Sequence, residues 1–194
     1  LTSITLYFYS KKINIPFIHM ADSAAAPLMI GYAIGRIGCH MSGDGDWGIV
    51  NKLDKPNFMS FLPDWFWKYN YPHNVISDGI PIPGCEGKHC FMLAEAVFPT
   101  PLYESIACII LFIILWMFRK KIKKAGVFFS FYILLNGIER LLIEQIRVNT
   151  KYHIGSYEIT QAEIIATVFI ILGSLGIYYF NKKNLSYNLK SAEI

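Results

Sequence analysis

The chain has 194 residues, of which 54% are hydrophobic and only 16% are charged. Soluble domains carry about a quarter charged residues, so this composition favours lipid over water as the surroundings. The net charge is +4, but the basic residues gather beside apolar runs, at 11–12, 119–124 and 182–183. No basic face alternates with exposed aromatic residues, which excludes a nucleic-acid-binding protein.

The chain opens inside an apolar run that begins at Leu1 and ends before two lysines at 11–12. This run is too short to span a bilayer, so we expect the tail of a helix here and the C-terminal part of a longer membrane protein. The next run, over 22–41, predicts a membrane helix with Asp22 as its N-cap. Its small residues suit close packing in a bundle, and Pro27 is expected to bend it or to loosen its first turns.

Residues 43–98 are polar, aromatic and rich in Pro, Gly and Asn, with no long apolar period. A stretch of this length without regular structure is usually functional or a small embedded domain. We therefore expect an irregular loop domain that faces outward. Its aromatic cluster over 58–71, with Trp65 and Trp67, either lies along the membrane interface, where indole rings are favoured, or packs within the loop. The sequence does not decide between the two.

Three further apolar runs predict spans, at about 101–118, 125–145 and 160–180. Thr100-Pro101 and the capping box Thr160-x-x-Glu163 are helix-start signals. A hydrocarbon core about 30 Å thick needs roughly 20 helical residues, which all three runs approach. The expected fold class is all-α: a single polytopic membrane helix bundle with four spans plus a partial N-terminal one.

The basic clusters orient this bundle. Under strict alternation of spans all three clusters fall on one side, which the positive-inside rule makes cytoplasmic. Residues 43–98 and 146–159 then face outward.

Two arginines lie at the same expected depth. Arg36 stands 14 residues after Asp22, and Arg140 stands 15 residues after Ala125, each counted from the cytoplasmic end. At about 1.5 Å per residue both lie roughly 21–23 Å up. A charged side chain at membrane depth is costly unless it is paired or wetted, and it marks a functional site by default. The two arginines predict a shared anion site.

The surroundings of both arginines support such a site. Glycines recur through 35–48 and let backbone N–H groups turn toward an anion or a polar head group. Arg140, Glu144 and Arg147 fall on one helical face, so Glu144 can pair with either arginine. The alternative is that the charged residues of this helix only neutralise one another through ion pairs near the membrane interface. Arg36 has no obvious partner in its own segment, and arginine's fork suits phosphate oxygens.

Four other residues near these arginines each allow two roles. His40 is a candidate general base near neutral pH, and a packing role is at least as good. Cys39 is either reactive or, more commonly for such a residue, small and buried. Glu104 either complements the dipole of its helix, which we favour, or belongs to the site. Tyr103 is similarly favoured as an interfacial anchor.

Cys85 and Cys90 lie five positions apart in the outward loop. A local disulfide in an oxidising compartment is the favoured arrangement. His73 and His89 keep zinc open as a weaker alternative, because the spacing matches no standard ligand set. Cys108 lies inside a predicted span and is expected to be a core residue.

Three ordered motifs resemble one family. Residues 35–48 (GRIGCHMSGDGDWG) resemble the signature GR-x-GNF-x-NGE with a later glycine. Residues 98–104 (FPTPLYE) are similar to HPSQLYE, and residues 140–147 (RLLIEQIR) are similar to R-x-x-x-E-x-x-R. On these motifs the chain, from about 22 to 180, is similar to the prolipoprotein diacylglyceryl transferases, enzymes of the bacterial inner membrane.

The resemblance implies a reaction and its partners. The family moves a diacylglyceryl group from phosphatidylglycerol to the thiol of a lipobox cysteine in a prolipoprotein signal peptide, within the lipid bilayer, and releases glycerol phosphate. It implies no cofactor and no metal, because arginine meets the phosphate charge. It also implies a multi-pass protein of the bacterial cytoplasmic membrane with residues 43–98 in the periplasm.

The resemblance also assigns roles. Arg36 and Arg140 would hold the phosphate-bearing head group and its developing charge. Glu144 and Arg147 would orient the arginines, and Asp44 would stand in for the signature's glutamate. The expected substrate-binding residues are Arg36, Asp44, Tyr103, Glu104, Arg140, Glu144 and Arg147, and the expected catalytic residues are Arg36, Arg140 and His40.

The chain departs from the family pattern at four positions. Cys39 and Ser42 replace asparagines, Phe98 replaces a histidine, and Asn136 stands where the family often has tyrosine. The family's His-Gly-Gly segment, with its proposed thiol-activating base, belongs to earlier spans. Two alternatives stay open: a non-catalytic relative that binds anionic lipid or signal peptides, and a small anion transporter with a site between helices.

Overall fold

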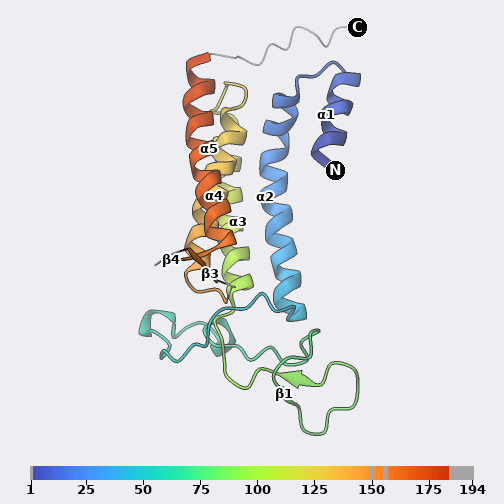
Figure 1. Cartoon of the computed structure of the whole chain (residues 1–194), viewed down its shortest axis with the longest axis vertical. Coiled ribbons are helices and arrows are strands. Elements are labelled where there is room, and N and C mark those ends of the chain that lie inside the picture. The colour runs from blue at the N-terminus through green and yellow to red at the C-terminus, as the bar shows by residue number, and fades with distance from the viewer. Residues whose placement is uncertain (1, 149–150, 155–156, 184–194) are drawn as a thin grey trace.

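The computed structural model describes residues 2–148, 151–154 and 157–183, and it is mainly helical (Figure 1). Its helices are α1 (Thr2–Lys12), α2 (Phe17–Ser42), α3 (Thr100–Phe118), α4 (Val127–Glu144) and α5 (Gln161–Lys183). Within the described part, α2, α3 and α5 are long and apolar enough to cross a membrane. The prediction of a mainly helical fold with apolar helices of membrane length is confirmed.

Helix α4 differs from these three in composition. Its 18 residues include Glu139, Arg140 and Glu144, three charged side chains that a lipid-facing helix would expose at high cost. The helix packs along α5 and also against α2 and α3, so the neighbouring helices shelter much of it. A fourth span remains a prediction.

Two helix starts agree with the sequence patterns. Helix α3 begins at Thr100, with a proline in its first turn. At the start of α5, the Thr160 N–H donates to Glu163 Oε2 at 2.9 Å, and the Glu163 N–H donates to Thr160 Oγ1 at 3.1 Å. This reciprocal pair is the predicted capping box. Helix α1 ends at Lys12, as expected.

The predicted N-cap at Asp22 is wrong. Helix α2 begins at Phe17 and continues through Pro27, so Asp22 lies inside it. The buried Asp22 carboxylate instead accepts the backbone N–H groups of Gly126 at 2.6 Å and Phe129 at 2.7 Å. Asp22 therefore caps the first turn of α4, a helix about a hundred residues away along the chain.

The helices meet through small side chains. Ala25, Met29 and Ala33 of α2 are fully buried against Cys108 and Leu115 of α3. Alanines allow the close approach of two helices, and one consequence is a hydrogen bond from the Ser105 hydroxyl to the Ala33 carbonyl at 2.9 Å. Cys108 is a core residue, as predicted.

Residues 43–98 form an irregular layer at one end of the bundle (Figure 1). Its short elements are η1 (Asn57–Met59), η2 (Asp64–Phe66), β1 (Ile80–Pro81) and β2 (Phe91–Met92), of which the two strands pair antiparallel. A small core of its own contains Trp47, Tyr71, Leu93 and Val97. The hairpin of β3 (Lys151–Ile154) and β4 (Tyr157–Thr160) connects α4 to α5.

The three basic clusters of the sequence lie at one end of the bundle. The C-terminal ends of α1 and α5 and the connection between α3 and α4, which carry the basic clusters, lie at the end opposite residues 43–98 (Figure 1). This is the arrangement that strict alternation of the helices predicts.

Candidate functional site

Glu104 is the residue on which the charged side chains converge. It lies in the first turns of α3 and is 1% exposed. Its Oε1 accepts from Arg140 Nη1 at 3.1 Å and from Arg147 Nη1 at 3.2 Å, and its Oε2 lies 2.5 Å from Arg36 Nε. Three guanidinium groups, one from α2, one from α4 and one just beyond α4, therefore share one buried carboxylate.

Asp46 is a second shared carboxylate. One of its oxygens pairs with Arg36 Nη1 and the other with Arg147 Nη2. Its backbone carbonyl accepts the Thr100 hydroxyl at 2.9 Å, which ties this loop to the start of α3. Glu104 and Asp46 thus hold Arg36 and Arg147 from two sides.

Asp46, and not the predicted Asp44, is the acid of this loop that contacts the arginines. Asp44 is exposed at the rim, where its carboxylate accepts the Asp46 N–H at 3.4 Å. Gly45 separates the two with φ of 98°, in the left-handed region that favours glycine. The resemblance pointed to Asp44, and only the folded backbone shows that Asp46 is the acid that turns toward the arginines.

Arg36 also has a partner in its own segment, contrary to the expectation from the sequence. The Tyr32 hydroxyl, one turn earlier on α2, accepts from Arg36 Nε at 3.0 Å and from Nη2 at 2.9 Å. The signal for this contact was the i, i+4 spacing of a tyrosine and an arginine. The predicted meeting of Arg36 and Arg140 is present, because both contact Glu104.

Arg140 is the most accessible of the three guanidinium groups. Its side chain is 23% exposed, against 13% for Arg36 and 8% for Arg147. Its contact with Glu144 is long, with 3.8 Å between Nη2 and Oε2. An incoming anion could therefore bind Arg140 while displacing fewer carboxylate contacts than it would at Arg36 or Arg147.

A cavity of about 530 Å³ leads to Arg140 between α2, α4 and α5. Its walls are mostly apolar, and the residues with polar groups are Tyr32, Tyr132, Asn136 and Arg140. A cavity with an apolar body and a few placed polar groups is typical of sites for amphiphilic ligands. Asn136, where the family often has tyrosine, lies on this wall.

Gly48 holds the site's loop against two other segments. Its N–H donates to the Phe98 carbonyl at 2.9 Å, and the next residue, Ile49, donates to the Ile146 carbonyl at 3.0 Å. A Cβ at position 48 would lie 2.6 Å from the Ile146 carbonyl oxygen. Only glycine allows this approach, which keeps Asp46 and Arg147 together.

His40 and Tyr103 lie outside the charged cluster. His40 Nδ1 is 3.1 Å from the Tyr71 hydroxyl, and its ring packs against Tyr69 and Trp65. Burial raises the pKa of the Tyr71 hydroxyl, so this group stays neutral. The Tyr103 hydroxyl donates to the Phe66 carbonyl at 2.8 Å and fastens η2 to α3.

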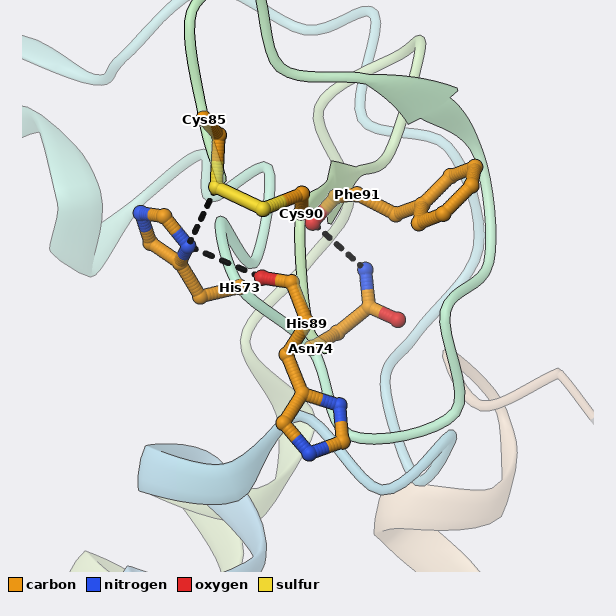
Figure 2. Close-up of a disulfide and its surroundings, with 6 residues drawn as sticks. All are labelled: His73, Asn74, Cys85, His89, Cys90 and Phe91. Carbon is orange, nitrogen blue, oxygen red and sulfur yellow. Dashed lines mark hydrogen bonds between the residues drawn. A yellow bond between two sulfur atoms is a disulfide. The ribbon is translucent and has the colours of Figure 1, made fainter. Parts of the chain in front are cut away.

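Cys85 and Cys90 form a disulfide in the loop domain (Figure 2). His73 Nδ1 lies 2.9 Å from the His89 carbonyl oxygen and 3.9 Å from Cys85 Sγ, whereas the His89 ring points away from the sulfurs. Since the two sulfurs are bonded to each other, they are not thiolate ligands for zinc here.

A scan against family models matches residues 1–179 to the prolipoprotein diacylglyceryl transferase family. The chain belongs to this family. Curated relatives named phosphatidylglycerol–prolipoprotein diacylglyceryl transferase are each 32% identical to it, from Lysinibacillus sphaericus over 177 residues, Clostridium botulinum over 184 and Leptospira interrogans over 148.

These alignments cover most of this chain but only part of each relative. They include 91%, 95% and 75% of the chain, and 56%, 62% and 38% of the relatives from Lysinibacillus, Clostridium and Leptospira. The chain therefore spans about half the length of the family members that it matches.

Proposed function

We propose that the protein transfers a diacylglyceryl group from phosphatidylglycerol to the cysteine thiol of a prolipoprotein, forming a thioether and releasing glycerol phosphate. The observation that supports this most is the convergence of Arg36 and Arg140 on Glu104 at the end of an apolar cavity. The name of the family supports the prolipoprotein acceptor, and the names of the curated relatives support phosphatidylglycerol as the lipid.

In this reaction the sulfur attacks the glycerol carbon that carries the phosphate ester. The C–S bond forms as the C–O bond breaks, and the phosphate leaves with the bonding electrons. Arg140, the most accessible guanidinium, would receive the phosphate oxygens with its fork, with Arg36 beside it. Preorganised donors aimed at developing negative charge are usually the largest single contribution to such catalysis.

The remaining predicted residues have supporting roles in this proposal. Arg147 and Glu144 would orient the arginines, because both lie within the same cluster of ion pairs. Asp44 stays a proposed head-group contact at the rim, and Tyr103 lies beside the site through its bond to η2. His40 stays a candidate for the group that accepts the thiol proton.

We also propose that the protein lies in the bacterial cytoplasmic membrane, with α4 as a fourth span. The end of the bundle with the basic clusters would be cytoplasmic, and residues 43–98 would lie in the periplasm. Phosphatidylglycerol and the signal peptide would then meet the arginines near the outer leaflet. No metal or cofactor is required, because the arginines meet the phosphate charge.

The test uses the protein in phosphatidylglycerol vesicles with a lipobox peptide, and mass spectrometry reads the lipid mass added to the cysteine. Arg36→Ala or Arg140→Ala should abolish the shift, whereas Arg119→Ala, at the opposite end of the bundle, should not change it. A protein that binds lipid and peptide but never modifies the thiol would refute the proposal and favour a non-catalytic relative.

A further inference from the structure

The cavity at Arg140 contains an amide that the charged cluster does not use. Asn136 lies in the middle of α4, is half-buried and lines this cavity. Its side chain forms no hydrogen bond with any residue that the structure describes. Polar side chains at membrane depth are costly, and they usually bond to a neighbouring helix or mark the path of a ligand. The free amide therefore indicates a polar group that enters from outside the chain.

The position of Asn136 relative to Arg140 indicates which group this is. The two are four residues apart, so they lie on one face of α4, about 6 Å apart along its axis. Arg140 is nearer the end of the bundle with residues 43–98, and Asn136 lies deeper (Figure 1). In a glycerophospholipid the acyl esters follow the phosphate toward the hydrocarbon. Guanidinium and amide therefore occur along α4 in the order of phosphate and ester in the lipid.

The rest of the cavity suits a hydrocarbon chain. Helices α2 and α5 both pack on α4, and the cavity lies between them. Leu28 of α2 and Ile165 and Phe169 of α5 supply apolar walls. Gly31 of α2 also lines the cavity, and a Cβ at this position would have no neighbouring atom within 4 Å. The missing side chain at Gly31 therefore leaves room for an acyl chain below the ester.

We propose that Asn136 donates a hydrogen bond to an acyl ester carbonyl of the donor lipid, and that it thereby selects ester-linked over ether-linked lipids. This inference rests on the proposed function, which places the phosphate of the lipid at Arg140. An ether lipid has the same head group and the same carbon for the sulfur to attack, but it lacks the carbonyl oxygen. With an ether lipid bound, the Asn136 N–H stays unpaired in an apolar cavity, which is costly.

The other neutral polar groups of the cavity fit this role less well. The Tyr32 hydroxyl already accepts from Nε and Nη2 of Arg36. Tyr132 lies two turns from Arg140, about 12 Å along the axis, and its ring stacks on Phe129. Asn136 combines an unused donor with a position one turn from the proposed phosphate site.

The experiment compares diacyl phosphatidylglycerol with the dialkyl ether form of the same chain length. Each is carried in phosphatidylcholine vesicles with a lipobox peptide, and mass spectrometry reads the lipid mass added to the cysteine. For the wild type, kcat/KM should be about tenfold higher for the diacyl lipid, the scale of one buried hydrogen bond. Asn136→Leu keeps the size of the side chain but removes the amide. It should lower the diacyl value to the dialkyl value and leave the latter near wild type.

The matched control is Asn181→Leu, which removes an exposed amide at the opposite end of the bundle. It should leave kcat/KM for both lipids unchanged. A comparison of linkages within each variant also removes any effect of the substitution that the two lipids share.

A second variant tests the seat of the chain without changing the amide. Gly31→Leu fills the open space on the α2 wall and should raise the KM for diacyl phosphatidylglycerol about tenfold, while the KM for the peptide stays constant. Equal KM values for the lipid in wild type and Gly31→Leu would overturn the placement of the chain in this cavity.

The outcomes separate this inference from the proposed function. If the wild type modifies the peptide with neither lipid, the transferase proposal itself fails. Equal transfer from both lipids by the wild type, or a preference that survives Asn136→Leu, would overturn the ester contact alone. An equal loss on both lipids in Asn136→Leu would also overturn it, because that result would show a structural effect.

Discussion

At the scale of single residues, Glu104 is the buried carboxylate that three guanidinium groups share. Arg36, Arg140 and Arg147 all contact it, and it is almost completely removed from solvent. Charges in such surroundings interact strongly, and removing one member of a buried pair leaves the other uncompensated. Loss of the Glu104 charge would remove an ion-pair partner from all three guanidinium groups.

Glu104→Gln keeps the shape of the side chain but removes its charge. We expect it to lower the free energy of unfolding by about 3–5 kcal/mol, measured as the unfolding midpoint in detergent and denaturant. Glu86→Gln, which changes an exposed glutamate, should leave the midpoint unchanged. An unchanged midpoint for Glu104→Gln would contradict the shared ion-pair geometry.

Arg140→Lys keeps the charge but replaces the planar fork with a single ammonium group. Since the fork matches the oxygens of a phosphate, transfer should fall about 100-fold, the scale seen when one preorganised donor is lost. The assay is the mass shift of the lipobox peptide, with Arg119→Lys as the control. Full activity of Arg140→Lys would show that only its charge matters.

At the scale of elements, Asp22 connects two helices. It lies inside α2, yet its two carboxylate oxygens accept backbone N–H groups at the start of α4. The first N–H groups of a helix have no partner within the helix, and here Gly126 begins the turn with φ of 87°. The contact fixes the level of α4 relative to α2, and so the level of Arg140 relative to Arg36.

Asp22→Ala should therefore destabilise the protein by about 1–2 kcal/mol, the usual cost of a lost cap. Thermal unfolding in detergent measures this, and Ser23→Ala, at the exposed neighbouring position, is the control. Asp22→Asn, which retains one acceptor oxygen, should fall between the two. A loss no larger than that of Ser23→Ala would contradict the cap.

The aromatic cluster over 58–71 divides into two groups. The Trp67 indole N–H donates to the Leu53 carbonyl at 3.1 Å, which is packing within the loop domain. Phe58 and Phe61 are 76% and 81% exposed, and Trp65 is 48% exposed. The exposed group is the part that suits the membrane interface.

Lipids brominated near the head group should accordingly quench the fluorescence of Trp65. The fraction of tryptophan fluorescence that the brominated lipid quenches is measured for the wild type and for each variant. Trp65→Phe should lower this fraction more than Trp67→Phe does. Equal quenching of Trp65 and Trp67 would contradict the placement of the exposed aromatic rings at the membrane interface.

At the scale of the whole molecule, the helix ends that carry the basic clusters lie at the end of the bundle opposite residues 43–98 (Figure 1). The positive-inside rule then predicts opposite faces for Lys52, in the loop domain, and Lys123, between α3 and α4. A cysteine at position 52 should react with an impermeant maleimide in intact cells, and one at position 123 only after the membrane is opened. Labelling of both positions from outside would refute the topology.

The sequence by itself determined the features that depend on local periodicity. Apolar runs of membrane length, the Thr100-Pro101 start and the capping box at Thr160 follow from short-range rules, and α3 and α5 begin as these rules predict. A constant rise per residue, counted from Asp22 and Ala125, predicted one level for Arg36 and Arg140, and both contact Glu104 although α2 begins earlier, at Phe17. The motifs were specific enough to indicate the family.

Only the tertiary structure decided which polar side chains meet. Asp46 rather than Asp44 contacts Arg36 and Arg147, Asp22 caps a distant helix, and Glu104 is shared by three arginines. Each of these depends on contacts between segments that are far apart in the chain or on one left-handed turn at Gly45. Sequence spacing fixes neither, because the direction of a side chain in a cluster is set by the packing of all the segments around it.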